Sequence, residues 1–218
     1  MKPLTEFVGT FLFLFTISLA AVGGSPIAPI AIGGALMVAV YMGGHRSGAH
    51  YNPAVSLGVL LRGRMSVSEF VAYVIAQVAA GLLAFALGYW ITGKGVALAP
   101  GPLFGPAKAL IVELVFTLFL VLTVLNVATE PKTEGNSYYG LAIGFAIVIA
   151  AIAGGAISGG AFNPAVGIGA VVVNAIATGG SMSSLWIYIV GPLLGGAIAA
   201  AIFKMQARKF EPVAAAAE

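Results

Sequence analysis

The sequence has no cysteine and no aspartate, and charged residues make up only 8% of its 218 positions. Without cysteine the chain can form no disulfide and no thiolate metal site, and the sequence does not indicate its redox compartment. Two histidines without cysteine or aspartate are a poor ligand set, so we expect no metal site and no cofactor. The ten lysines and arginines form no basic run, which argues against nucleic acid as a partner despite a net charge of +3.

Apolar residues, in contrast, make up 60% of the chain, and the mean hydropathy is +1.06. A water-soluble domain of this size could not bury so much apolar surface, so the composition predicts an integral, multi-pass protein of the lipid bilayer. Six stretches are long and apolar enough to cross the bilayer as helices: 4–22, 27–43, 67–91, 109–128, 138–153 and 185–203.

The tripeptide Asn-Pro-Ala occurs twice, as Asn52, Pro53 and Ala54 and as Asn163, Pro164 and Ala165. Each copy lies near the end of a longer shared pattern, Gly-Gly-x-x-Ser-Gly-x-x-aromatic-Asn-Pro-Ala-Val. The residues around Glu6 also match those around Glu113. A cleaved secretory signal would not be duplicated inside the mature protein, so we expect 4–22 to be a membrane span.

These matches predict a single domain, 1–218, built from two halves, 1–92 and 108–204. Each half has three spans and one loop that carries the motif. Because three is odd, the second half must enter the membrane in the opposite orientation, which makes an inverted repeat.

Basic residues indicate which side is the cytoplasm. With the N-terminus inside, eight basic residues lie in inner segments and two, Lys94 and Lys108, in outer ones. The eight are Lys2, Arg46, Arg62, Arg64, Lys132, Lys204, Arg208 and Lys209. Both termini are therefore expected in the cytoplasm.

A short apolar run follows each motif, 55–61 in the first half and 166–173 in the second. As helices these runs would measure about 10–12 Å, less than half of a hydrocarbon core of about 30 Å. Asparagine is a strong helix N-cap and proline suits the first helical position, so two half-helices should start here and meet near the bilayer centre. Their positive ends would repel cations, and each asparagine NH₂ would face the lumen as a donor.

The glycine pairs that open the pattern, Gly43-Gly44 and Gly154-Gly155, are expected to be non-helical. Such backbone is tolerated at membrane depth only where it lines protein or a wet cavity, so its carbonyls should act as acceptors for a passing solute.

With this duplicated motif, nearly the whole chain resembles the aquaporin (major intrinsic protein) family. The resemblance implies an all-α membrane fold of six tilted helices and two re-entrant half-helices, and a homotetramer with one pore per subunit. Its function would be passive passage of water and small uncharged solutes, without enzymatic activity.

The chain departs from the family at the selectivity filter. Most similar members carry arginine directly after the second motif, where this chain has Val166. The other three filter positions of the family fall on Ile32, Ala151 and Gly160. A ring without side-chain donors should be wide and apolar. In lacking this arginine, the chain resembles some bacterial members of the family that are associated with arsenite. We therefore expect the protein in a bacterial or archaeal inner membrane. Arsenite-type hydroxides or glycerol are the alternative solutes.

Three further polar residues match the family pattern. The resemblance gives Glu6 and Glu113 the role of accepting backbone N–H groups of the re-entrant loops, whereas a proton relay in a coupled secondary transporter is the alternative. His50 is expected to line the inner vestibule or to pack within its loop. An intramembrane enzyme is disfavoured, because only the first half has a histidine near its motif serine.

Overall fold

The computed structural model describes residues 1–208, and within them the secondary structure is entirely helical. They comprise six long helices, two short ones and a single 3-10 turn, η1 (Pro131–Thr133). The long helices are α1 (Lys2–Gly23), α2 (Ala28–Ser47), α4 (Val67–Thr92), α5 (Pro106–Ala128), α6 (Tyr139–Ser158) and α8 (Leu185–Arg208). The short ones are α3 (Pro53–Arg62) and α7 (Pro164–Thr178).

The six long helices match the six predicted spans, and all are long and apolar enough to cross a membrane. Many of their large apolar side chains are exposed, among them Ile75, Ile111 and Ile152, each at least 60% accessible. Exposed apolar side chains on every side of a helical bundle are expected where lipid replaces water. The prediction of an all-α membrane fold is confirmed.

The prediction that the two glycine pairs are non-helical is wrong. Gly43 and Gly44 lie in the last turns of α2, and Gly154 and Gly155 lie in those of α6. None of the four has a positive φ angle. The space that a glycine leaves is used for packing instead: a Cβ on Gly154 would come 3.0 Å from the ring of Phe116. Within each shared pattern, the non-helical loop before the motif therefore covers only residues 48–51 and 159–162.

The helices pack in a pattern that repeats between the halves. In the first half α1 contacts α2 and α4, and in the second α5 contacts α6 and α8 in the same way. The halves interlock, because α4 packs on α7, α8 packs on α3, and α2 packs on α6. This is the inverted repeat expected from an odd number of spans in each half.

Two glycines let each short helix press against a long helix of the other half. A Cβ on Gly81 of α4 would lie 2.7 Å from the carbonyl oxygen of Ala165, at the start of α7. A Cβ on Gly196 of α8 would lie 2.5 Å from the carbonyl oxygen of Ala54, at the start of α3. Small residues are what allow such close backbone approach in membrane proteins.

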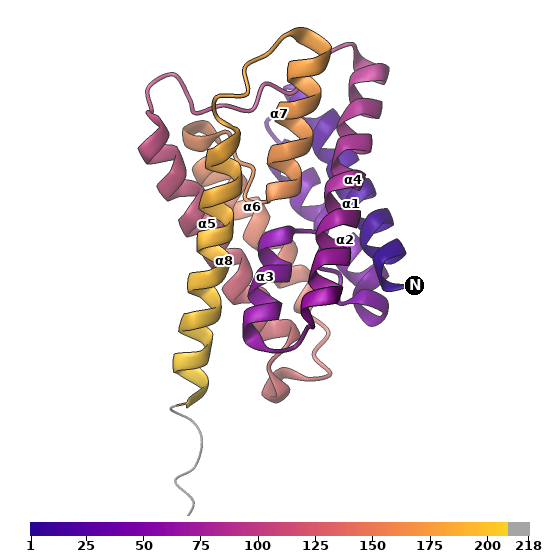
Figure 1. The fold of residues 1–218 in the computed structure, drawn as a ribbon, viewed down its shortest axis with the longest axis vertical. Helices are drawn as coiled ribbons and strands as arrows, with labels where there is room; N and C mark the ends of the chain where they lie inside the picture. The colour runs from indigo at the N-terminus through magenta and orange to yellow at the C-terminus, as the bar shows by residue number, and fades with distance from the viewer. Residues whose placement is uncertain (209–218) are drawn as a thin grey trace, which may run out of the picture.

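The short helices occupy opposite levels of the bundle, with α7 in the upper part of Figure 1 and α3 in the lower part. Their ten and fifteen residues correspond to about 15 and 22 Å, so neither can span the hydrocarbon alone. The helix α7 is longer than predicted, because its apolar run continues to a left-handed cap at Gly179.

Lys2 at the start of α1 forms an exposed ion pair with Glu69 near the start of α4, with 2.9 Å between the ammonium nitrogen and the nearer carboxylate oxygen. Glu69 also forms a capping box with Ser66, which explains why α4 begins there. Lys209, one of the residues assigned to the inner side, and the C-terminal end lie outside the described residues.

Candidate functional site

Both motif asparagines cap the helices that follow them. The side-chain oxygen of Asn52 accepts from the amide of Ala54 at 2.8 Å, and that of Asn163 accepts from the amide of Ala165 at 2.9 Å. Pro53 and Pro164 occupy the first helical positions, where a missing N–H leaves nothing unpaired.

The two helix starts touch through reciprocal hydrogen bonds. The NH₂ group of Asn52 donates to the carbonyl of Phe162 at 2.9 Å, and that of Asn163 donates to the carbonyl of Tyr51 at 2.9 Å. Each NH₂ has two hydrogens, so one is used in this contact and one is left over. Sequence reasoning placed the whole NH₂ in the lumen and missed this bond, which holds the half-helix tips together.

The four-residue loops before the motifs share one unusual backbone conformation. Gly48, Ala49 and Tyr51 have positive φ angles, and so do Gly159, Gly160 and Phe162 at the matching positions. Three of these six residues are not glycine, and such positions cost about 1–3 kcal/mol each unless the surroundings enforce them. Both loops therefore need firm anchors.

Buried glutamates provide those anchors. Glu6 accepts from the backbone amides of His50 at 3.0 Å and Tyr51 at 2.8 Å. Glu113 accepts from the amides of Ala161 at 3.0 Å and Phe162 at 2.6 Å. Both carboxylates are fully buried. Each carboxylate thus accepts hydrogen bonds from backbone amides of its loop that would otherwise lack an acceptor.

Serines complete the anchors in both halves. The hydroxyl of Ser47 donates to Glu6 at 2.6 Å, and that of Ser158 donates to Glu113 at 2.7 Å. Sequence reasoning considered these serines only as nucleophiles, although their repetition in both motifs was a signal for a structural role.

A cavity of about 40 Å³ lies beside the half-helix tips. A space of about 10–15 Å³ open to water centres holds one water, so several fit here. Most of its wall is built from matching positions of the two halves: Phe13 and Leu120, Ile17 and Val124, Ile32 and Ile143, Leu36 and Ile147, Ala49 and Gly160, His50 and Ala161, and Asn52 and Asn163.

The cavity wall has both apolar and polar parts. Within residues 1–208, the carbonyls of Ala49, His50, Gly160 and Ala161 accept no hydrogen bond from protein. These four residues and both asparagines border the cavity. The cavity therefore lies next to loop residues with unpaired carbonyl acceptors and next to both asparagines.

Three of the four predicted filter residues border the cavity, and the fourth does not. Ile32, Ala151 and Gly160 border the cavity. Val166 does not; it is 3% exposed and belongs to the buried core around α7. Three of the four positions thus lie together, and Val166 contributes no surface to this cavity.

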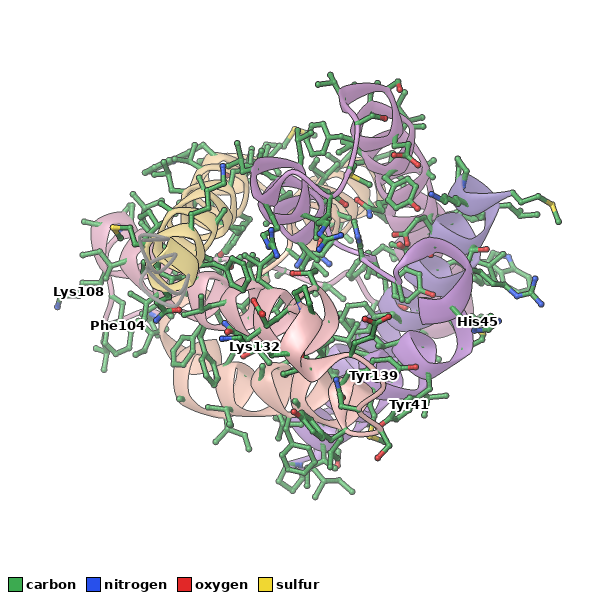
Figure 2. All side chains as sticks on the ribbon, turned by 90° about the horizontal axis from the view of Figure 1, so that it is seen from below. Tyr41, His45, Phe104, Lys108, Lys132 and Tyr139 are labelled. Atoms are coloured by element: carbon green, nitrogen blue, oxygen red, sulfur yellow. The ribbon has the colours of Figure 1, made fainter. Side chains whose placement is uncertain are left out.

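A larger vestibule of about 570 Å³ opens toward the end of the molecule where α3 lies. His50, Val124 and Ile143 border both spaces, so the vestibule lies next to the cavity. Residues 129–131 and 133–136 form part of its wall. The hydroxyl of Tyr41 donates to the carbonyl of Ser137 at 3.0 Å, and its ring lies edge-on to that of Tyr139; Figure 2 shows the two tyrosines side by side.

The sequence matches the family model described as major intrinsic protein over residues 1–203. The chain belongs to the major intrinsic protein family. Members of this family are passive channels of membranes rather than enzymes.

Two plant members of the major intrinsic protein family show how widely the similarity extends. A probable aquaporin of TIP type from Medicago truncatula is 37% identical, covering 93% of this chain and 85% of that protein. Aquaporin NIP1-4 from Oryza sativa subsp. japonica is 36% identical, covering 90% of this chain and 73% of that protein. Plant relatives give no support to the expected bacterial or archaeal membrane.

A solved structure agrees on the fold. The aquaglyceroporin from Plasmodium falciparum superposes with a TM-score of 0.82 at 22% identity, covering 93% of this chain and 94% of that one. At this identity the likeness concerns the fold alone.

Proposed function

We propose that this chain is a passive channel for water and small uncharged solutes, which pass along the two loops and between the two asparagines. The observation that carries the proposal is the reciprocal contact of the half-helix tips beside a cavity with unpaired donors and acceptors. A neutral solute can exchange its water partners for these groups and move on without a large barrier.

Ions are excluded at the tips. Each half-helix contributes about half a positive charge at its N-terminus, and both N-termini point at one spot, which repels cations. A water that accepts from both Asn52 and Asn163 must turn its hydrogens outward, and this orientation interrupts proton hopping.

We assign the filter to Ile32, Ala151 and Gly160, which border the cavity, and add Val166, the fourth filter position of the family, whose side chain is buried and contributes no surface to the cavity. None of these side chains can donate a hydrogen bond, so the ring discriminates by size alone. Support comes from the three positions that border the cavity. Such a filter admits solutes larger than water, and glycerol or arsenite-type neutral hydroxides are the alternative physiological solutes.

In the membrane, the end that holds α3 faces the cytoplasm, together with both termini. Halves 1–92 and 108–204 act as the two repeats of one domain, and four copies assemble as a homotetramer with one pore each. The orientation follows from the excess of basic residues at that end, and the assembly follows from the family resemblance.

Proteoliposomes compared side by side with water, glycerol and arsenous acid test the proposal. Stopped-flow light scattering should show passage of water and of glycerol-sized solutes above that of empty vesicles, without saturation or dependence on an ion gradient. Passage of water alone would refute the wide filter, and ion-driven, saturable uptake would indicate a coupled secondary transporter instead.

Val166→Arg should reduce glycerol passage more than water passage. An arginine after the motif would narrow the wide ring and add donors, which hinders the larger solute more. The ratio of the glycerol to the water rate in stopped-flow experiments measures this effect, with Val166→Leu as the apolar control. Equal reduction of both rates would contradict the assignment of Val166 to the filter.

A further inference from the structure

Two cations at the end of the bundle that holds α3 have no acidic partner in the described part of the chain. Arg62 ends α3, and Lys204 lies in the last turn of the apolar span of α8. Among residues 1–208 neither side chain forms a hydrogen bond or an ion pair. The matching positions of the inverted repeat, Val173 and Tyr89, carry no charge. Building a half-helix and the span beside it therefore does not require these two cations.

The guanidinium of Arg62 is held in place by the ring of Phe203. Its central carbon lies 4.5 Å from the ring centroid, and Phe203 is only 2% exposed. Nε of Arg62 is buried and has no hydrogen-bond partner among residues 1–208. Stacking fixes the plane of the guanidinium, so less conformational entropy is lost when it binds an anion. Of the five N–H donors of arginine, the four on the two terminal nitrogens remain for such a ligand.

Lys204 lies next to this stacked pair, on the side of α8 that is turned away from α5. It follows Phe203 directly and is exposed. Gly196, seven residues before Phe203 and hence on the same side of α8, packs against the start of α3. Gly195, nine residues before Lys204 and hence on the opposite side of the helix, packs against α5. Both cations thus meet where α8 and α3 come together.

Exposed apolar side chains surround this junction. Figure 1 shows α3 between the lower parts of α8 and α4, and α3 contacts both helices. The apolar residues on these three helices are each 39–59% exposed: Leu61, Val71, Ile198 and Met205. Such a surface suits acyl chains, whereas cations at the ends of membrane spans lie at the depth of lipid headgroups. A free phosphate ion would need no apolar surface beside its site.

We propose that Arg62 and Lys204 bind the phosphate group of an anionic phospholipid, whose acyl chains lie on the apolar surface of α3, α4 and α8. The fork of arginine pairs with two phosphate oxygens, and lysine adds a second positive charge. Basic pockets between membrane spans are suited to acidic lipid headgroups for this reason. The inference goes beyond the channel function and does not depend on it.

Native mass spectrometry of the protein in detergent micelles tests the site, with phosphatidylglycerol and phosphatidylcholine of identical acyl chains as probes. The wild type should bind phosphatidylglycerol more tightly by about tenfold or more, since each cation near an acidic headgroup is worth about fivefold. Lys204→Gln should weaken phosphatidylglycerol binding about fivefold. Arg62→Gln should weaken it about tenfold, and Arg62→Lys, which keeps the charge without the fork, should lie between Arg62→Gln and the wild type. Equal affinity of the wild type for both lipids would overturn the inference.

Lys108→Gln is the matched control. Lys108 lies 5.8 Å from the ring centroid of Phe104 near the start of α5 (Figure 2), so its replacement removes the same charge beside an aromatic ring elsewhere. This variant should keep wild-type affinity for phosphatidylglycerol. Lys204 is exposed, so Lys204→Gln should fold even if Arg62→Gln does not. Unchanged binding in Lys204→Gln, or equal weakening in Lys108→Gln, would overturn the site.

Thermal unfolding separates a lipid from free phosphate as the ligand. A ligand that binds only the folded state raises the melting temperature. Phosphatidylglycerol should raise that of the wild type more than that of Lys204→Gln, whereas inorganic phosphate at the same concentration should raise neither. Equal stabilisation by inorganic phosphate would show an anion site without a lipid and would overturn the proposal.

Discussion

Replacing Glu113 with alanine should leave little folded protein in the membrane. The carboxylate accepts from the hydroxyl of Ser158 and from the amides of Ala161 and Phe162. Each donor left unpaired in a buried site costs about 1–3 kcal/mol, so three of them cost about 3–9 kcal/mol. Native proteins are stable by only about 5–15 kcal/mol, so the loss removes much or all of the stability. The yield of monodisperse protein after detergent extraction and its melting temperature measure the effect.

Glu113→Gln and Glu134→Ala are the matched controls. Glutamine keeps one acceptor oxygen but turns an NH₂ toward donors, so its stability should fall between that of alanine and the wild type. Glu134 is exposed, and its replacement should leave the melting temperature unchanged. Any Glu113→Gln protein that folds should pass solute without dependence on a proton gradient. An alanine variant as stable as the wild type would show that the carboxylate is not the loop anchor.

Ala151→Phe should strongly reduce glycerol passage and reduce water passage by less. Ala151 lies on α6, and its side chain borders the cavity beside the half-helix tips. A phenyl ring there must fill part of the path or displace the wall, and overpacking of this kind costs about 1–3 kcal/mol. As a barrier to a solute that needs the same space, this corresponds to a loss of about 5–150-fold in rate. Stopped-flow rates for glycerol and water measure both effects.

Ala153→Phe gives the control, because Ala153 is on the same helix but exposed. The same ring on that surface should contact lipid and leave both rates unchanged. If Ala151→Phe passes glycerol as fast as the wild type, the solute path does not run along this part of α6.

The half-helices could be predicted because their signals are local. Asparagine is a strong N-cap and proline suits the first helical position, and a glycine such as Gly63 or Gly179 ends the helix. The glycine pairs were wrongly predicted to be non-helical because their conformation depends on contacts that are not local. Whether Gly43 continues a helix or breaks it depends on what packs against it, and its partner Tyr51 lies in the following loop.

Three site positions came from the family resemblance and not from the repeat alone. Ile32, Ala151 and Gly160 were placed by counting the filter positions of the family from the motif, and all three border the cavity. The stacking of Arg62 on Phe203 could not be found from the repeat, because the other half has Val173 and Gly88 in their places. The contact of each asparagine with the opposite loop was also beyond prediction, since it joins residues about half the chain apart.

The temperature dependence of osmotic water permeability tests the central claim most directly, namely that a continuous wet path passes the two joined helix tips. In proteoliposomes we predict fast water flow with an activation energy close to that of diffusion in bulk water, because each water exchanges one set of hydrogen bonds for another. Water flow no faster than in empty vesicles, or with the steep temperature dependence of lipid permeation, would contradict the account.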